Sequence, residues 1–264
     1  MLDVPIIDHH DIDAATAAFH RDGFVAVSGS LTADQLGFAQ RGAARVIAEE
    51  TSETPLERAN RGFARYSFGD QMAHPEWTML TDLPTILPII DRIWGSEDHQ
   101  CVGGGGDYSL PGASIQCLHS DLSDFLNDPL GQTTVRDLPT PFIVVNFLMV
   151  DFTVANGAIR FVPGTQRSRT PIPAIADEPE WMRTLQLCAP AGTAVIRDVR
   201  CWHGGSANRS SMIRPMTSVG YYAPWFRGPA YGVMPRDLYE GLSARGRKLC
   251  RMLVDSTETA VVGG

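Results

Sequence analysis

Two short stretches that lie far apart in the chain constrain its fold more than any other feature. The first carries His119 and Asp121 in an H-x-D spacing, and the second carries His203, followed eleven residues later by Arg214. Residues two apart in an extended strand point to the same face, so this imidazole and this carboxylate can approach one cation. If His203 joins them, two histidines and one carboxylate hold the ion. That set suits Fe(II), because three protein ligands leave coordination positions open.

The H-x-D spacing on its own is a weak signal. The chain contains three such pairs, which are His9/Asp11, His20/Asp22 and His119/Asp121. We expect His9 and His10 to lie in a solvated tail, and His20 and Asp22 to straddle the end of a short helix. Only the third pair has a strand-like run before it and a β-rich region after it, so it is the candidate ligand pair.

The hydrophobic patterns predict a mainly β fold with flanking helices. Helices are expected over 14–21, 32–50, 77–94 (interrupted near Pro84 and Pro88) and 235–253. Strands are expected over 24–27, 114–118, 142–152, 158–162, 185–187, 193–196 and 212–222, with Asn156-Gly157 as a hairpin turn. Many short strands after a largely helical first third indicate a double-stranded β-helix, the cupin-like jelly roll. The length fits one domain over 1–264: a helical part to about 100, a jelly-roll core over about 101–226 and a C-terminal helix over about 235–253.

Two further stretches carry local predictions. The run Gly103-Gly104-Gly105-Gly106 lacks the G-x-x-x-x-G-K signature of a phosphate-binding loop, so we expect a bulge or a close backbone approach within the sheet. Residues 124–141 form a long polar insertion directly after the ligand pair, and segments of this length in compact domains are often lids. We therefore expect the insertion to be mobile without substrate and to order over the site.

Composition argues against several classes of protein. The formal net charge of −8 argues against non-specific nucleic-acid binding, and no apolar run is long enough to span a membrane. The first residues, Met-Leu-Asp-Val-Pro, do not resemble a secretory signal. The five cysteines are scattered and unpatterned, which indicates reduced thiols and a cytoplasmic protein.

The segment from about 63 to 222 resembles the phytanoyl-CoA dioxygenase family of Fe(II)- and 2-oxoglutarate-dependent oxygenases. The matching motifs are Gln116-x-x-His119-x-Asp121, Asn156-Gly157-x-x-x-Phe161-Val162-Pro163-Gly164-Thr165-Gln166, and His203-Gly204-Gly205-Ser206-x-Asn208 with Arg214. The family usually has Ser-His where this chain has Thr165-Gln166, a departure outside the ligand set. The order and spacing of the motifs make the resemblance specific, although no single motif would.

The resemblance implies an iron ion held by His119, Asp121 and His203. It also implies that Arg214 binds the distal carboxylate of 2-oxoglutarate and that Gln116 helps to hold this cosubstrate. The expected reaction consumes dioxygen, decarboxylates 2-oxoglutarate to succinate and hydroxylates a small molecule, a natural-product intermediate.

Alternation along the last strand separates two arginines that follow His203. Arg214, Met216 and Ser218 share one face, which we place inside the barrel, whereas Arg209 lies in a polar turn and should face water. An unpaired buried guanidinium would be costly, so an inward Arg214 implies an anionic partner.

The substrate side is less constrained. Arg65 and Tyr66 are weaker candidates for substrate or cosubstrate contacts, and the sequence shows no basic cluster for a coenzyme A phosphate, which favours a free small molecule. The same iron set also serves desaturation, epoxidation and rearrangement. Two other functions stay open: a catalytically silent metal-binding barrel, and a cupin-like isomerase that uses another divalent ion. Neither needs a buried clamp for a dicarboxylate, so Arg214 and Gln116 distinguish them from an oxygenase.

Overall fold

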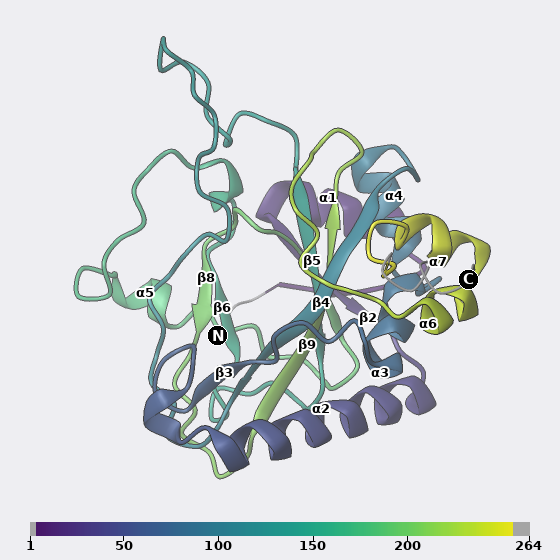
Figure 1. Ribbon diagram of the computed structural model, residues 1–264. Coiled ribbons are helices and arrows are strands. Elements are labelled where there is room, and N and C mark those ends of the chain that lie inside the picture. Colours follow the sequence, from purple (N-terminus) through teal and green to yellow (C-terminus); the bar gives the residue numbers. More distant parts are fainter. Residues whose placement is uncertain (1–3, 256–264) are drawn as a thin grey trace.

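The computed structural model describes residues 4–255 and places a large sheet opposite a small one (Figure 1). The large sheet has seven strands in the order β1-β2-β7-β5-β9-β4-β3, and neighbouring strands are antiparallel except for β1 and β2. The small sheet is the antiparallel pair β6-β8. The strands are β1 (Ile6–Asp8), β2 (Phe24–Ser28), β3 (Arg65–Ser67), β4 (Gln100–Ser109), β5 (Phe142–Leu148), β6 (Ile159–Phe161), β7 (Ala194–Asp198), β8 (His203–Gly205) and β9 (Arg214–Tyr222).

The helices follow the predicted positions closely in the first half of the chain. The α-helices are α1 (Ile12–Asp22), α2 (Ala33–Glu53), α3 (Pro75–Thr78), α4 (Leu87–Trp94), α5 (Glu180–Arg183), α6 (Arg236–Gly241) and α7 (Ala244–Leu249), and the 3-10 helices are η1 (Leu56–Arg58), η2 (Met79–Asp82) and η3 (Thr165–Arg167). Thr32 caps α2, because its hydroxyl accepts a hydrogen bond from the Gln35 backbone N at 3.2 Å. The predicted break falls at Pro84, whereas Pro88 lies in the first turn of α4, where proline is tolerated. No helix between residues 4 and 255 is both long and apolar enough to cross a lipid bilayer.

The large sheet separates two hydrophobic cores, because its side chains alternate between its faces. In β2, Val25 and Val27 pack with the helices, whereas Phe24 and Ala26 pack with residues of the small sheet. Figure 1 shows α4, α6 and α7 grouped on the side of the large sheet away from β6 and β8. The first third of the chain is not purely helical, since β1, β2 and β3 all join the large sheet.

The predicted hairpin at Asn156-Gly157 is wrong, although a turn does form there. β5 pairs with β7 and β9, and β6 pairs with β8, so the chain crosses from one sheet to the other at this turn. The Asn156 side chain closes the turn by accepting from the Thr153 backbone N at 2.9 Å and donating to the Asp151 carbonyl at 2.7 Å. A Cβ at Gly157 would lie 2.7 Å from the Ser206 carbonyl oxygen, so the glycine serves a close approach to the chain after β8.

The predicted strand over 114–118 is also wrong, because side chains bind the backbone groups that a strand ladder would use. Gln116 N donates to Gly205 O at 2.9 Å, but the Gln116 carbonyl accepts from the Arg160 guanidinium at 2.6 Å. The Leu118 backbone N donates to the Glu178 carboxylate at 3.3 Å. The segment is therefore extended and irregular until His119, which forms an isolated antiparallel bridge with His203.

Near the C-terminus the structure replaces the single helix predicted over 235–253 with α6 and α7. Helix α6 ends with Leu242 as its C-cap, and the Ser243 hydroxyl then caps α7 by accepting from Gly246 N at 2.9 Å. A serine that offers its own cap favours a new helix start over continuation. The segment over 185–187 likewise forms only an isolated bridge, between Gln186 and Arg160.

The glycine run behaves as predicted. It lies in β4, whose pairing with β9 shifts register between Cys101 and Gly103. A Cβ at Gly105 would lie 2.2 Å from the Gly69 carbonyl oxygen, and one at Gly103 would lie 2.2 Å from the Tyr231 ring. The missing side chains therefore let two other segments of the chain lie directly on this strand.

Candidate active site

The structure brings His119, Asp121 and His203 together between the two sheets. One ligand atom from each of the three side chains lies within 4.8 Å of the others. The Asp121 Oδ1 atom is 3.5 Å from His119 Nε2 and 3.6 Å from His203 Nε2. The antiparallel bridge between His119 and His203 sets this geometry, because it holds the two histidine backbones side by side. These spacings suit one divalent ion at the centre of the group.

Both histidines present the same ring nitrogen to that centre. His119 Nδ1 lies 3.2 Å from the Cys117 carbonyl oxygen, and His203 Nδ1 lies 2.9 Å from the Cys201 carbonyl oxygen. A carbonyl oxygen only accepts hydrogen bonds, so each Nδ1 carries the hydrogen and each Nε2 keeps a free lone pair. Burial and the charge of Arg197 lower the pKa of His203 to about 3, so its ring is neutral at physiological pH.

Arg197, which the sequence analysis did not single out, holds the third ligand. Its Nη1 donates to Asp121 Oδ2 at 2.7 Å, while its Nε donates to the Asn146 side-chain oxygen at 2.9 Å. Burial alone would raise the pKa of Asp121, but the charge of Arg197 and its hydrogen bond to the carboxylate hold that pKa below its usual range. One carboxylate oxygen is thus engaged by Arg197, and the other is turned toward the histidines. The sequence offers one sign of this role: Arg197 is a charged residue that directly follows the apolar run of strand β7.

A cavity of about 580 Å³ is lined by these three ligands and also by Arg214. Its lining includes Arg214, Met216 and Ser218, the face of β9 that alternation predicted to point inward. A volume of this size accommodates small-molecule ligands.

Arg214 is buried in this cavity, and no carboxylate between residues 4 and 255 forms an ion pair with it, although the charge of Asp107 acts on it from the same cavity. It is 1% exposed, its Nε donates to the Ser109 hydroxyl at 3.3 Å, and its guanidinium lies 4.7 Å from the centre of the Phe152 ring. Its Nη1 is buried and has no hydrogen-bond partner among residues 4–255. Burial and the charge of Arg65 lower the pKa of Arg214 to about 9. An anion placed here would satisfy the free donor and relieve that repulsion.

Gln116 and Arg65 also line the cavity, and they are held by the end of β8 and by the residue after it, respectively. The Gln116 side-chain oxygen accepts from Gly205 N at 2.9 Å. One Arg65 nitrogen donates to the carbonyls of Ser114 and Ser206, at 3.0 and 2.9 Å. Arg209, in contrast, is exposed, as predicted.

Tyr66, the other weak candidate, lies outside the cavity lining. Its ring packs in the core on the helical side and stacks on Tyr108 at 5.1 Å between ring centres. Its hydroxyl donates to the Thr54 carbonyl at 2.9 Å. Neighbouring residues of β3 point to opposite faces, which explains why Arg65 reaches the cavity and Tyr66 does not.

A buried ion pair supports the ligand-bearing segment from behind. Arg160 and Glu178 are paired at 2.7 Å with both side chains fully buried, and they bind the backbone of Gln116 and Leu118 as described above. A buried ion pair of this kind is weak evidence for added stability, and its observed effect here is to fix the backbone positions of Gln116 and Leu118. No sequence pattern marks this pair, because the two residues are 18 positions apart and meet only through the irregular chain between them.

One wall of the cavity is built from two irregular segments that rest on the glycine run. Gly69 and Asp70 belong to the first segment and Tyr231 to the second, and all three line the cavity. Asp70 joins the segments, because its carboxylate accepts from the backbone N of Val233 at 3.0 Å. Tyr231 N donates to the Val102 carbonyl at 2.9 Å, which fixes the second segment to β4.

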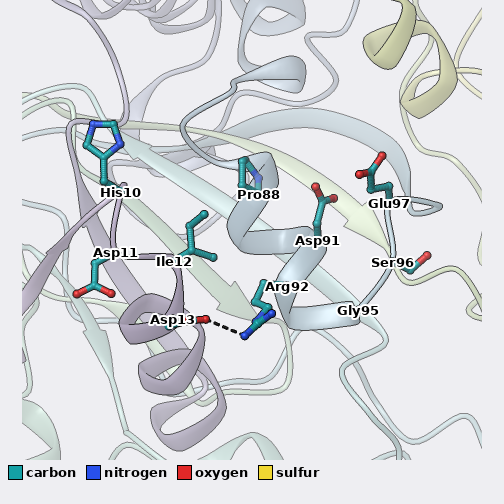
Figure 2. A pocket seen from close by; sticks show the side chains of 10 residues that line it. All are labelled: His10, Asp11, Ile12, Asp13, Pro88, Asp91, Arg92, Gly95, Ser96 and Glu97. Atoms are coloured by element: carbon teal, nitrogen blue, oxygen red, sulfur yellow. Dashed lines mark ion pairs between the residues drawn. The ribbon is translucent and has the colours of Figure 1, made fainter.

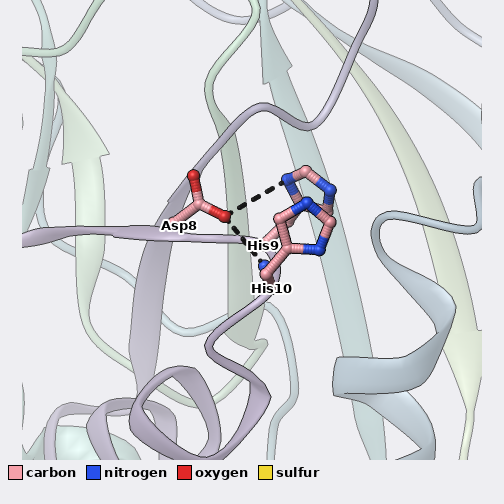
Figure 3. A group of neighbouring side chains, drawn as sticks. All are labelled: Asp8, His9 and His10. Atoms are coloured by element: carbon pink, nitrogen blue, oxygen red, sulfur yellow. Dashed lines mark hydrogen bonds and ion pairs between the residues drawn. The ribbon is translucent and has the colours of Figure 1, made fainter.

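The other two H-x-D pairs do not line this cavity. Asp11 caps α1 by accepting from Ala14 N at 3.1 Å, and Asp22 pairs with Arg21 at 2.6 Å. Asp8, His9 and His10 form a second group whose ligand atoms lie within 4.8 Å of one another, at the end of β1 (Figure 3). Asp8 and His10 are exposed there, but the predicted solvated tail is wrong: the His9 side chain is only 19% exposed, and its backbone N donates to the Ser28 carbonyl at 3.2 Å, which ties the segment to β2.

A shallow hollow of about 760 Å³ lies beside that group, between the start of α1 and α4 (Figure 2). Charged side chains line it, and Arg92 pairs with Asp13 at 2.9 Å across it. It lacks the combination of a three-ligand group and a buried unpaired cation, which the cavity at His119 has.

Known proteins resemble this chain over most of its length. The family model Phytanoyl-CoA dioxygenase (PhyH) matches residues 19–216. The dioxygenase trt7 of Aspergillus terreus is 24% identical over 169 residues, which are 63% of this chain and 57% of that protein. The chain therefore matches somewhat more than half the length of this curated relative.

Solved structures share the fold at low sequence identity. AviO1 from Streptomyces viridochromogenes Tue57 is 21% identical with a TM-score of 0.61, covering 83% of this chain and 98% of its own. HygX from Streptomyces hygroscopicus, solved with nickel, 2-oxoglutarate and hygromycin B, is 17% identical with a TM-score of 0.63, covering 83% and 95%. The epimerase SnoN, solved with Fe3+, alpha ketoglutarate and nogalamycin RO, is 20% identical with a TM-score of 0.62, covering 81% and 84%. These similarities confirm the predicted double-stranded β-helix with flanking helices.

Proposed function

This chain belongs to the phytanoyl-CoA dioxygenase family of Fe(II)- and 2-oxoglutarate-dependent enzymes, and we propose that it hydroxylates a small natural-product intermediate. We further propose that the whole chain acts as one catalytic domain, since strands from its first third and from its β-rich half share one sheet. One observation carries the functional proposal: a three-ligand group and a buried, unpaired arginine lie in the same cavity.

The donor set fits iron. His119 and His203 each offer an Nε2 lone pair, and Asp121 offers one carboxylate oxygen while Arg197 engages the other. Three protein ligands on one side of the ion leave positions open for a cosubstrate and dioxygen. When bound, iron would supply the activation of dioxygen that accompanies decarboxylation of 2-oxoglutarate to succinate.

The rest of the cavity fits the cosubstrate. Arg214 would take the distal carboxylate of 2-oxoglutarate through its free Nη1, and Gln116 lines the same cavity. A guanidinium binds a carboxylate through two parallel hydrogen bonds, which fixes the orientation of the whole molecule. A metal-binding barrel without catalysis, or an isomerase that uses another divalent ion, would gain nothing from an unpaired arginine at this depth.

The molecules bound in structures of similar proteins support a small natural product as the substrate of this chain. HygX and SnoN were solved with hygromycin B and nogalamycin RO bound. The cavity of about 580 Å³ falls within the usual range for small-molecule sites, roughly 300–1,000 Å³. SnoN is an epimerase, so rearrangement stays beside hydroxylation as a second outcome of the same site.

The test measures succinate formed from 2-oxoglutarate by the purified protein with Fe(II), in the presence of a metabolite extract. We expect succinate only when the metal, 2-oxoglutarate and a substrate-containing fraction are all present. Mass spectrometry of the product then separates three classes of outcome: hydroxylation or epoxidation adds one oxygen atom, epimerisation leaves the mass unchanged, and desaturation removes two hydrogens. A metal-loaded protein that does not bind 2-oxoglutarate at all would refute the proposal.

A further inference from the structure

The insertion over 124–141 has two parts with different surroundings. It has no helix or strand, and Figure 1 shows it reaching away from the two sheets. Leu130 near its tip is 75% exposed, whereas Val135 and Thr140 in its second half are buried. The second half is therefore packed on the body of the protein, while the tip is exposed to solvent.

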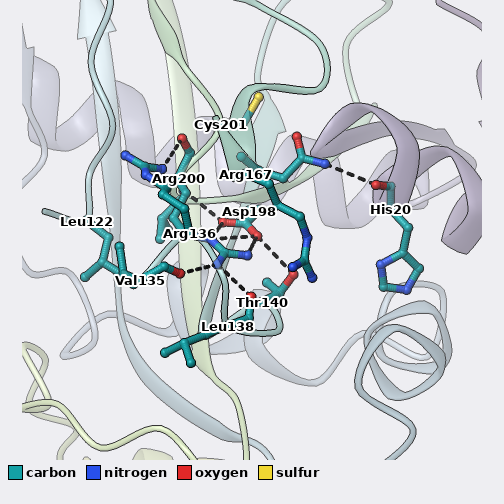
Figure 4. Close-up of polar contacts among 12 residues, drawn as sticks. His20, Leu122, Val135, Arg136, Leu138, Thr140, Arg167, Asp198, Arg200 and Cys201 are labelled. Carbon is teal, nitrogen blue, oxygen red and sulfur yellow. Dashed lines mark hydrogen bonds and ion pairs between the residues drawn. The ribbon is translucent and has the colours of Figure 1, made fainter. Parts of the chain in front are cut away.

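A buried arginine holds the second half of the insertion against the turn before β8 (Figure 4). Arg200 and Asp198 are both fully buried and paired at 2.6 Å. Arg200 Nη1 also donates to the carbonyls of Val135 and Leu138, at 2.7 and 2.9 Å, and Thr140 donates to Asp198 at 2.9 Å. The insertion is thus bonded to the chain that runs directly into His203.

Arg136 extends this network to the other ligand-bearing segment. Its Nη2 donates to the Ser120 hydroxyl at 3.1 Å, and its Nη1 donates to the Arg200 carbonyl at 2.9 Å. Ser120 lies between His119 and Asp121, and Arg200 lies three residues before His203. One guanidinium from the insertion therefore binds both segments whose separation determines whether the three ligands converge.

We propose that Arg136 is a positioning residue that couples ordering of the insertion to assembly of the metal-binding group. The inference rests on the proposed iron site. Charge-assisted hydrogen bonds are stronger than neutral ones, and both acceptors of Arg136 are in place only when the two segments have the spacing that the ligands need. Metal binding and the ordered insertion then stabilise each other, and this coupling is reciprocal by thermodynamic necessity.

The chain offers a matched control in the same insertion. Arg169 donates to the Gln132 carbonyl at 2.8 Å and to the Asp137 carboxylate at 2.5 Å. In the described part of the chain it makes no hydrogen bond to residues 119–121 or 198–203. Arg169→Gln therefore loosens the insertion without touching either ligand-bearing segment, whereas Arg136→Gln removes one hydrogen bond from each of them.

The experiment titrates Co(II) into metal-free protein and follows its visible absorption bands, which report the affinity and geometry of the site. We expect Arg136→Gln to weaken Co(II) binding by about tenfold and to change the band shape, as loss of groups that orient metal ligands does. Arg136→Lys, which can reach only one acceptor at a time, should fall between this variant and the wild type. Arg169→Gln should match the wild type.

Hydrogen exchange tests the reverse direction of the coupling. Co(II) should increase protection over residues 133–138 in the wild type and in Arg169→Gln, but not in Arg136→Gln. If Arg136→Gln does not fold, Ser120→Ala replaces it, because this change removes one acceptor and leaves the insertion's other anchors intact.

Unchanged affinity and band shape in the tested variant would overturn the proposal, as would an equal loss in Arg169→Gln. A wild-type protein that binds no Co(II) would instead overturn the proposed iron site, and the coupling with it.

Discussion

Replacement of Arg214 by methionine should weaken the binding of 2-oxoglutarate without lowering the stability of the ligand-free fold. Methionine roughly fills the same space but cannot bind a carboxylate, so the metal-loaded variant loses a buried ion pair with 2-oxoglutarate. Removing one partner of such a pair costs about 1.4–4 kcal/mol here, which corresponds to a rise of about tenfold to a thousandfold in KM for 2-oxoglutarate. The same range applies to Arg214→Ala, which also leaves a cavity.

Without 2-oxoglutarate the effect on stability should have the opposite sign. Arg214 is then a buried cation whose repulsion from Arg65 outweighs its attraction to Asp107, and it has one hydrogen bond to Ser109 and a free Nη1. Apolar replacement of a poorly satisfied buried charge is often neutral or stabilising. The ligand-free variant should therefore melt at the wild-type temperature or a few degrees above it, since about 1 kcal/mol shifts Tm by roughly 2–4 °C in domains of about this size.

Two assays check both halves of this prediction. A steady-state titration of 2-oxoglutarate gives KM, and calorimetric titration into Ni(II)-loaded protein gives the affinity without turnover. Arg209→Gln is the control, because Arg209 is exposed and should leave both quantities within about twofold of the wild type. A variant at position 214 that binds 2-oxoglutarate as tightly as the wild type, or a large loss in Arg209→Gln, would refute the reasoning.

Four further predictions concern the metal site and the insertion. His119→Ala, Asp121→Ala and His203→Ala should each abolish metal binding while circular dichroism shows the fold intact; full oxygenase activity in one variant would remove that residue from the site. The product should be free of chlorine even in chloride buffer, because Asp121 occupies the position that halide would need, and a chlorinated product would contradict this. Saturating substrate should raise hydrogen-exchange protection at the tip of the insertion over 124–141, and equal protection would count against a lid. Since burial and Arg197 lower the pKa of His203 from an unfolded value near 6.5 to about 3, the unfolded chain binds the extra proton between these values. The metal-free protein should therefore lose stability as pH falls below about 6.5, and thermal melts of His203→Gln should show a smaller decline.

Local rules predicted the parts of the site that depend on alternation and spacing. The inward face of β9 follows from period-two alternation, which places Arg214 in the cavity and agrees with the structure. The H-x-D pair also converges with His203, although its segment is not the regular strand that we expected. Side chains of Arg160 and Glu178 take over two of its backbone groups, and pairing between distant residues of this kind cannot be read from neighbouring positions.

Residues missed by the sequence analysis are those whose roles depend on strand register. Arg197 reaches Asp121 only because β7 lies beside β5, where Asn146 takes its Nε. The hairpin predicted at Asn156-Gly157 failed for the same reason, since a turn signal specifies the local bend and not the partner of the next strand. Long-range pairing was thus the main missing information, both for the fold and for the groups that hold the metal ligands.

The glycine run of β4 has a practical consequence for anyone who wishes to change what this protein accepts. At Gly103 and Gly105 the strand has no side chains, so Tyr231 and the backbone at Gly69 form the cavity wall there. Asp70 joins their two segments through its hydrogen bond to the Val233 backbone N. A side chain added on the strand would push these segments away and disturb the pairing with β9. A library that varies Tyr231, and keeps Gly69 with its φ of 68° and Asp70 in place, would instead reshape this wall without altering the sheet or the metal ligands.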